Sequence, residues 1–248
     1  MSHSFLRVLR VLQAEPRLIQ EPHMNTRSIL SLLGCIAFGI ALLPTPAQAD
    51  KPLAVAPVFG DHMVLQRGMQ LPVWGTAEPG SVVRVRFGKQ SKETETRGDG
   101  QWRIVLDSMP TSATPREMTV TSASAELKFE DVLVGDVWIC SGQSNMQFKL
   151  SSCDDSDAEI AAASHPELRL NGGKGWRASS PASVPRFSAV AYFFGRKIHT
   201  KIGTPVGLIA RALGGTPIEW WTPKEKLGRV AFAKAAMEKP SDEWAKYE

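Results

Sequence analysis

The sequence predicts a small antiparallel β-sandwich over residues 50–130 followed by an α/β domain with a doubly wound parallel sheet over residues 131–248. Two observations support this division. Short runs of alternating apolar and polar residues, separated by Gly, Pro and Asp, fill residues 53–129 and are typical of half-buried antiparallel strands. After residue 131, strand-like runs alternate with helical patterns, which is the order of elements in βαβ units.

The first part contains three clear strand candidates, at residues 82–87, 102–106 and 118–121. Each alternates with a period of two, and a Gly-Asp-Gly turn precedes the second. Trp74 and Trp102 lie in such alternating segments. Aromatic side chains of a β-sandwich can bind sugars, but we interpret these two as core residues, because large side chains in alternating strands are usually buried.

In the second part, residues 155–164 are predicted to form a short helix that ends before Pro166. Residues 168–170 form a brief strand candidate. Residues 206–210 are continuously apolar or small, which is typical of a parallel strand buried on both faces.

The segment 188–202 is predicted to be the principal helix of the α/β part, with Ser188 as its cap and Gly203 just beyond its end. One helical face is apolar, so we expect that face to cover the sheet. The residues of this face are Val190, Ala191, Phe194, Ile198 and Ile202.

Residues 135–146 contain the candidate nucleophile. An apolar strand-like run gives way to small and polar residues, and Ser144 is left at its carboxyl end. Ligands and reacting groups gather at the carboxyl ends of strands in open α/β sheets, where backbone N–H groups can surround a hydroxyl. The alternative is a plain strand-to-helix turn.

A second block has the features of a helix start. Thr216 and Glu219 have the spacing of a capping box, and Pro217 would occupy the first helical position, so a helix is predicted to begin at Thr216. Gly214 and Gly215 before it permit a close backbone approach, and the loop could hold the negative charge that develops on an ester carbonyl oxygen. An ordinary glycine turn is the alternative.

These blocks together resemble the sialate O-acetylesterase family, a branch of the SGNH (GDSL-like) hydrolases. The resemblance spans roughly residues 55–227, and its most specific motifs are Gly-Gln-Ser-Asn-Met and Gly-Gly-Thr-Pro-Ile-Glu. The matching segments are residues 61–66, 73–75, 135–146, 187–196, 205–209 and 214–219.

The resemblance implies a carbohydrate O-acetylesterase that removes acetyl groups from acetylated sialic acid or related sugars, with acetylated xylan an equal possibility. Ser144 then corresponds to the nucleophile. The N–H groups of Ser144 and Gly215, assisted by Gly214, would hold the oxyanion, and Gln143 and Asn145 would contribute to substrate binding. The resemblance implies no metal and no organic cofactor.

The catalytic base of the family is not found in this sequence. In the family the histidine belongs to an Asp-x-x-His arrangement near the end of the catalytic domain, and none of His62, His165 and His199 has an aspartate three residues earlier. We therefore expect none of them to be the base, and we expect the chain to be an amino-terminal fragment of a longer hydrolase. The alternatives are a non-catalytic secreted carbohydrate-binding protein or an inactive truncated product.

Two further positions depart from the family pattern. Leu213 stands where the family usually has tryptophan, and Arg211 places a charge near a strand end. Both departures affect the expected shape of the substrate pocket.

Residues 1–49 are predicted to be an upstream extension and a secretory signal peptide. Met24 offers a second start, Arg27 supplies the positive charge, residues 29–43 form the apolar core, and residues 47–49 form a small-residue cleavage site. The protein is therefore expected in the periplasm or outside the cell. The apolar core is too short for a stable membrane anchor.

Cleavage after residue 49 would remove two acidic and four basic residues and leave 25 Lys and Arg against 23 Asp and Glu. This near balance, without a basic run, argues against a nucleic-acid partner. Cys140 and Cys153 would remain, as one disulfide or as two free thiols. No Cys/His metal motif is present, and the sequence makes no prediction of oligomeric state.

Overall fold

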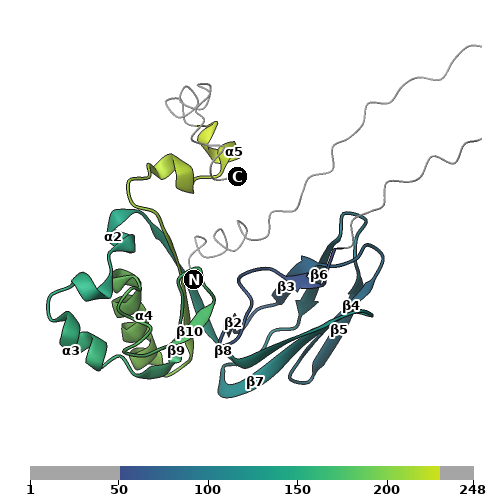
Figure 1. The fold of residues 1–248 in the computed structure, drawn as a ribbon, viewed down its shortest axis with the longest axis horizontal. Coiled ribbons are helices and arrows are strands. Elements are labelled where there is room, and N and C mark those ends of the chain that lie inside the picture. Colours follow the sequence, from purple (N-terminus) through teal and green to yellow (C-terminus); the bar gives the residue numbers. More distant parts are fainter. Residues whose placement is uncertain (1–50, 230–248) are drawn as a thin grey trace, which may run out of the picture. The chain divides into compact units, whose positions relative to one another are not determined.

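The computed structural model describes residues 51–229, all within one compact unit of the chain. The predicted upstream extension and signal peptide, and the charged stretch after residue 229, lie outside the described residues. The described chain is mixed α/β and rich in sheet (Figure 1). No helix within 51–229 is long and apolar enough to cross a lipid bilayer.

A three-stranded antiparallel sheet is formed by β1 (Ala54–Val55), β3 (Leu71–Thr76) and β6 (Gln101–Leu106) in the order β1-β3-β6. The predicted strand at 102–106 lies in β6. Trp102 is buried in the core, as predicted, and Trp74 of β3 is half-buried.

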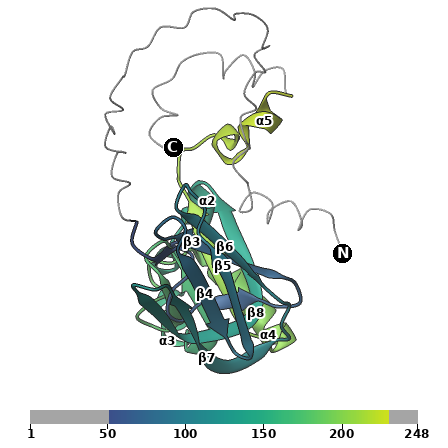
Figure 2. The same cartoon turned by 90° about the vertical axis from the view of Figure 1, so that its right-hand side faces the viewer.

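The second sheet begins with an antiparallel series made of β5 (Gln90–Glu95), β4 (Val82–Phe87), β7 (Ser112–Thr121) and β8 (Glu126–Gly142). Figure 2 shows β4 and β5 side by side. The predicted strands at 82–87 and 118–121 are therefore confirmed. Their alternation has the expected consequence, because Val83, Val85 and Phe87 of β4 enter the same apolar core as Trp102 of the other sheet.

Strand β8 is 17 residues long and belongs to both halves of this second sheet. Its first part pairs with β7 in antiparallel fashion, and residues 133–135 pair in parallel with β2 (Val64–Gln66). Residues 136–142 pair in parallel with β11 (Val206–Ala212). One strand thus runs across residues 130 and 131, where its pairing with β7 shifts register, and ends at Gly142, just before Gln143 and Ser144.

The parallel part has the order β10-β9-β11-β8, with β9 (His165–Asn171) and β11 parallel and β10 (Trp176–Ser179) antiparallel at the edge. The predicted strands at 168–170 and 206–210 lie in β9 and β11. The predicted helix at 155–164 is observed as the shorter α3 (Ser156–Ala161).

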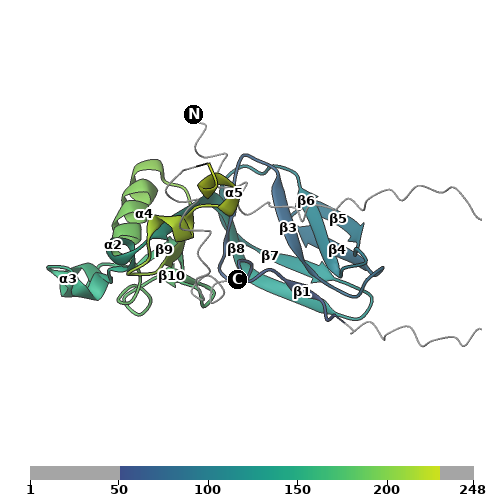
Figure 3. The same cartoon turned by 90° about the horizontal axis from the view of Figure 1, so that it is seen from above.

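Helix α4 (Ala189–Ile202) has the predicted limits. The Ser188 hydroxyl accepts a hydrogen bond from the Ala191 N–H at 3.2 Å, and Gly203 ends the helix in the left-handed conformation with φ of 61°. Figure 3 shows α4 beside β9, and the helix packs on β9 and β11.

The predicted apolar face of α4 was partly wrong, although Ala191 and Ile198 do pack in the core. Of its members, Val190, Phe194 and Ile202 are 47%, 39% and 44% exposed, whereas Gly195 and its buried neighbours face the sheet. The cause is a close approach: a Cβ at Gly195 would lie 2.4 Å from Leu208 Cδ1 of β11. The helix therefore comes closest to the sheet at Gly195, next to the fully buried Tyr192, and this sets which face is buried.

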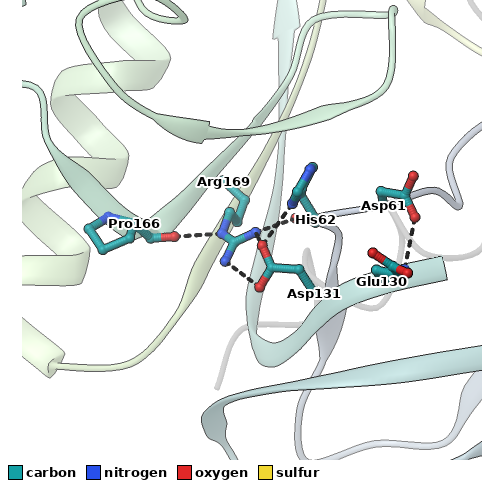
Figure 4. Close-up of polar contacts among 6 residues, drawn as sticks. All are labelled: Asp61, His62, Glu130, Asp131, Pro166 and Arg169. Carbon is teal, nitrogen blue, oxygen red and sulfur yellow. Dashed lines mark hydrogen bonds and ion pairs between the residues drawn. The ribbon is translucent and has the colours of Figure 1, made fainter.

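Arg169 of β9 joins three segments that are distant in the sequence (Figure 4). Its guanidinium is almost fully buried and donates to both carboxylate oxygens of Asp131, at 2.5 and 3.0 Å. The same group donates to the backbone carbonyl of His62 at 3.3 Å, and its Nε donates to the Pro166 carbonyl at 2.5 Å. The guanidinium thus binds β8, β9 and the segment before β2 together.

Three further hydrogen bonds hold the same region together. His62 and Asp131 both have positive φ, at 64° and 54°, and the His62 ring nitrogen Nδ1 lies 2.7 Å from Asp131 Oδ2. The His62 N–H donates to the Glu130 carbonyl, and the Glu130 N–H donates to the Asp61 carboxylate (Figure 4). The turn before β2 is therefore fixed to the middle of β8.

The Asp131 pKa is lowered from its ordinary value, mainly by the hydrogen bond from Arg169 and further by His62, against an opposing effect of partial burial. A carboxyl whose folded pKa is depressed stabilises the fold above its unfolded pKa, and this contribution is lost as the pH falls.

We predict that Asp131→Asn lowers the free energy of unfolding by roughly 2 to 4 kcal/mol at pH 7, because the buried Arg169 charge loses its partner. Asparagine tolerates the left-handed backbone, so the substitution isolates the charge. Denaturant unfolding at several pH values should show the deficit in full above about pH 4 and a shrinking deficit below it.

The matched control is His62→Asn, which keeps the backbone conformation and removes only a half-exposed imidazole. Its effect should stay within about 1 kcal/mol. Identical unfolding curves for the wild type and Asp131→Asn at pH 7 would contradict the role assigned to the Arg169–Asp131 pair.

Candidate functional site

Ser144 lies where the sequence predicted it, beyond the carboxyl end of a sheet strand. Strand β8 ends at Gly142, and the single-turn helix α2 (Ser144–Gln147) begins with the serine itself. The side chain of Ser144 is exposed. The turn therefore presents the hydroxyl to solvent at the strand end.

The side chain of Gln143 holds this hydroxyl. Its Oε1 accepts a hydrogen bond from Ser144 Oγ at 2.9 Å and from the Ser144 N–H at 3.2 Å. An amide oxygen accepts hydrogen bonds but is not a proton acceptor at neutral pH. Gln143 therefore orients Ser144 without activating it.

The glycine block is brought to the same place by β11. Ala212, the last residue of this strand, stands opposite Gly142 in the parallel register, and the Leu213 N–H donates to the Gly142 carbonyl at 3.1 Å. A Cβ on Gly214 would lie 3.5 Å from Ser144 Oγ. The two blocks that the sequence singled out are thus in direct contact.

The two glycines differ in how their N–H groups are used. The Gly214 N–H donates to Gln147 Oε1 at 2.8 Å. Gly215 has φ of 79°, and no hydrogen bond of its N–H is found within residues 51–229. Gly215 is exposed, and a side chain there would meet no atom within 4 Å.

An open hollow of about 320 Å³ lies over the serine. Ser144, Asn145 and Val190 line it, together with Gly142, Gln143 and Met146. Val190 is one of the α4 residues that do not face the sheet, and its exposed side chain forms one wall. Asn145 is exposed, so its amide is available to a ligand.

The helix predicted to begin at Thr216 was wrong. Thr216 is buried, and its hydroxyl donates to the Leu213 carbonyl at 2.6 Å and accepts from Trp221 Nε1 at 2.9 Å. The hydroxyl therefore does not cap a helix. A short 3₁₀ helix, η2 (Ile218–Trp221), follows instead, after Pro217 in an extended conformation.

Trp221 was not identified from the sequence as part of this site. Its indole N–H braces the glycine loop through Thr216. The only sequence signal was a tryptophan shortly after the Gly-Gly-Thr-Pro block, and that signal does not reveal a contact back to the loop.

The three described histidines lie toward the amino ends of the parallel strands, whereas Ser144 lies beyond their carboxyl ends. His165 begins β9, at the amino end of the parallel strands, and the His199 ring centroid is 6.5 Å from that of His165. His62 contacts Asp131, which precedes the parallel part of β8. At about 3.3 Å per residue, the register places His165 on the order of 30 Å from the strand end that carries Ser144.

His165 and His199 have structural partners near the amino ends of the parallel strands. His199 Nδ1 lies 2.8 Å from the Thr204 carbonyl oxygen. Burial lowers the pKa of His165, and the nearby His199 and Arg196 act in the same direction, against Glu159.

The two described cysteines are free thiols. Cys140 is buried in β8, and this burial raises the pKa of its thiol to about 11. Cys153 is half-buried, with its sulfur 3.9 Å from the Lys149 carbonyl. Among residues 51–229, no group of histidine, cysteine or acidic side chains is arranged to hold a metal ion.

Arg211, a departure from the family pattern, lies on β11 beside the site and is exposed. Its Nη1 donates to the Ala210 carbonyl at 2.8 Å and lies 3.4 Å from the side-chain oxygen of Asn171. Asn171 is fully buried at the end of β9. The Arg211 guanidinium therefore points toward β9 rather than into the hollow over Ser144.

Comparison with known proteins agrees with this geometry. Residues 134–243 match the family model described as carbohydrate esterase, sialic acid-specific acetylesterase. The chain is 30% identical over 238 residues to sialate O-acetylesterase from Homo sapiens, covering 80% of this chain and 46% of that protein. It is 29% identical over 225 residues to the sialate O-acetylesterase of Rattus norvegicus, covering 76% and 42%.

A solved structure is also similar. It is a carbohydrate acetylesterase from Xanthomonas citri, with a TM-score of 0.67 and 32% sequence identity over 71% of this chain and 43% of that one. The chain spans less than half the length of the curated relatives it matches.

The fold and the matched segment place the chain among the carbohydrate esterases. Within that class it belongs to the sialate O-acetylesterase family, as the Gly-Gln-Ser-Asn-Met and Gly-Gly-Thr-Pro-Ile-Glu motifs predicted.

Proposed function

We propose that this protein is a carbohydrate O-acetylesterase that removes acetyl groups from acetylated sialic acid or related acetylated sugars, with Ser144 as its nucleophile. The observation that carries the proposal is the closeness of the exposed Ser144 hydroxyl, which lines an open hollow, to the glycine loop, where a Cβ on Gly214 would lie 3.5 Å from Ser144 Oγ. The names of the relatives, sialate O-acetylesterase and carbohydrate acetylesterase, support the substrate class.

In the proposed reaction, Ser144 Oγ attacks the carbonyl carbon of the acetyl ester as its proton leaves to a base. The bond between that carbon and the sugar oxygen then breaks, and the sugar leaves with a proton. Water attacks the resulting acetyl-serine, which releases acetate and restores the hydroxyl. The three histidines of residues 51–229 lie toward the amino ends of the parallel strands, away from Ser144, so none of them serves as that base in this proposal.

The charge that develops on the carbonyl oxygen needs N–H donors. Gly215 is the first candidate, because its N–H is not engaged within the described residues, whereas that of Gly214 is bonded to Gln147. The Ser144 N–H becomes a second donor when Gln143 Oε1 gives way to the substrate. Asn145 lines the hollow and supplies an amide for the sugar.

The finer architecture belongs to the same proposal. We propose that the two sheets of residues 50–130 form a β-sandwich and that residue 131 onward forms an SGNH-type, doubly wound sheet. The shared apolar core of β4 and β6 supports the first, and the parallel strands β8, β11 and β9 support the second.

A non-catalytic carbohydrate-binding function is the second candidate. The observation in its favour is that Ser144 Oγ donates to an amide oxygen, which cannot remove its proton. Such a protein would bind an acetylated sugar at the hollow and leave it intact.

We predict that Ser144→Ala lowers kcat for acetate release by a factor on the order of a million, as for loss of the serine in an assembled triad. KM should change little and folding should be unaffected, because the side chain is exposed. Acetate release from O-acetylated sialic acid and from acetylated xylan would be measured with the whole protein expressed from its own gene.

The control is Ser151→Ala, which removes an exposed serine outside the hollow and should leave kcat unchanged. Retention of wild-type turnover by Ser144→Ala would place the nucleophile elsewhere. A wild-type protein that binds these sugars without releasing acetate would favour the second candidate.

We further propose that the protein is exported and that the signal peptide is cleaved after Ala49, since a charged region, an apolar core and the Ala-Gln-Ala motif occur in the required order. Amino-terminal sequencing of the protein from the native host should begin at Asp50. Recovery of the protein from the cytoplasm with Met1 or Met24 intact would contradict this.

A further inference from the structure

We propose that Gln147 is a positioning residue, which fixes the glycine loop against the nucleophile so that the Gly215 N–H serves as the oxyanion donor. The inference rests on the proposed esterase function and assigns a further residue to the same site. Gln147 neither reacts nor contacts the reacting atoms in this account. It acts through the backbone of Gly214.

The geometry is a tie between two chain segments. Gln147 is the last residue of α2, and its Oε1 accepts the Gly214 N–H at 2.8 Å. A second bond, from the Leu213 N–H to the Gly142 carbonyl, fixes the loop one residue earlier. Gln147 therefore supplies the side-chain contact that reaches the glycines themselves.

The other side of the loop is braced separately. The Thr216 hydroxyl donates to the Leu213 carbonyl and accepts from Trp221, and these two hydrogen bonds also hold the loop. Gln147 holds it from the side of Ser144. Gly215 keeps a left-handed backbone, and its N–H donates to no group within residues 51–229.

The position of the loop matters because it lies close to the nucleophile. A Cβ at Gly214 would stand 3.5 Å from Ser144 Oγ and 2.8 Å from Gln147 Oε1. Displacement of reacting groups by about 1 Å can reduce a rate by about a hundredfold. A loop that loses its tie to α2 would therefore bind substrate but stabilise the transition state less well.

Gln147 is exposed, and within the described residues its side chain makes only this hydrogen bond. Its removal should therefore cost little stability. This separates a positioning role from a role in packing, for which loss of activity would follow loss of fold.

The test compares three variants of the whole protein expressed from its own gene. Gln147→Met keeps the length of the side chain and removes the acceptor, and it should lower kcat for acetate release about 10- to 100-fold, with KM within about threefold of wild type. Gln147→Glu keeps the acceptor and should retain more kcat than the methionine variant. Gln101→Met, an exposed glutamine of β6, should match the wild type.

Amide hydrogen exchange at Gly214 provides a second readout, independent of activity. The Gly214 amide should exchange faster in Gln147→Met, while the melting temperature and the exchange of β8 amides remain those of the wild type.

Unchanged kcat and unchanged Gly214 exchange in Gln147→Met, with an active wild type, would overturn the role of Gln147 and leave the esterase function standing. A loss of activity that appears entirely in KM would also overturn it. An inactive wild type would overturn the esterase function, and the role of Gln147 with it.

Discussion

The continuous backbone of β8 is the constraint on which the rest of the structure depends. This strand pairs with β7 in one direction and with β2 and β11 in the other, so it joins the antiparallel and parallel parts of the sheet. The buried Arg169 guanidinium fixes its middle by bonding Asp131 and the His62 carbonyl. The position of Ser144 follows from this register, because the serine stands two residues after Gly142, the last residue of the strand.

The site forms because two parallel strands end at the same level. Gly142 and Ala212 are opposite one another in β8 and β11, so the residues that follow them must meet. Glycine is required at 214, where a side chain would enter the space between Ser144 and Gln147. Ser144 and the glycine loop are therefore positioned by strand register, and only the final adjustment falls to side chains.

Local patterns predicted the elements and the place of Ser144, since period-two alternation and the cap at Ser188 depend on neighbouring residues. Features that depend on distant contacts were not predicted. The Thr216 hydroxyl does not cap a helix because it bonds Leu213 and Trp221. The buried face of α4 is set by the approach of Gly195 to Leu208. The Arg169–Asp131 pair joins strands that only the fold brings together.

The central claim is that Ser144 becomes transiently acetylated. The most direct measurement is acid quenching of the whole protein during turnover of 4-nitrophenyl acetate, followed by peptide mapping with mass spectrometry. The account predicts one acetyl group on the peptide that contains Ser144, and its absence from the Ser144→Ala variant. An acetyl group on another residue, or hydrolysis at the wild-type rate by that variant, would contradict it.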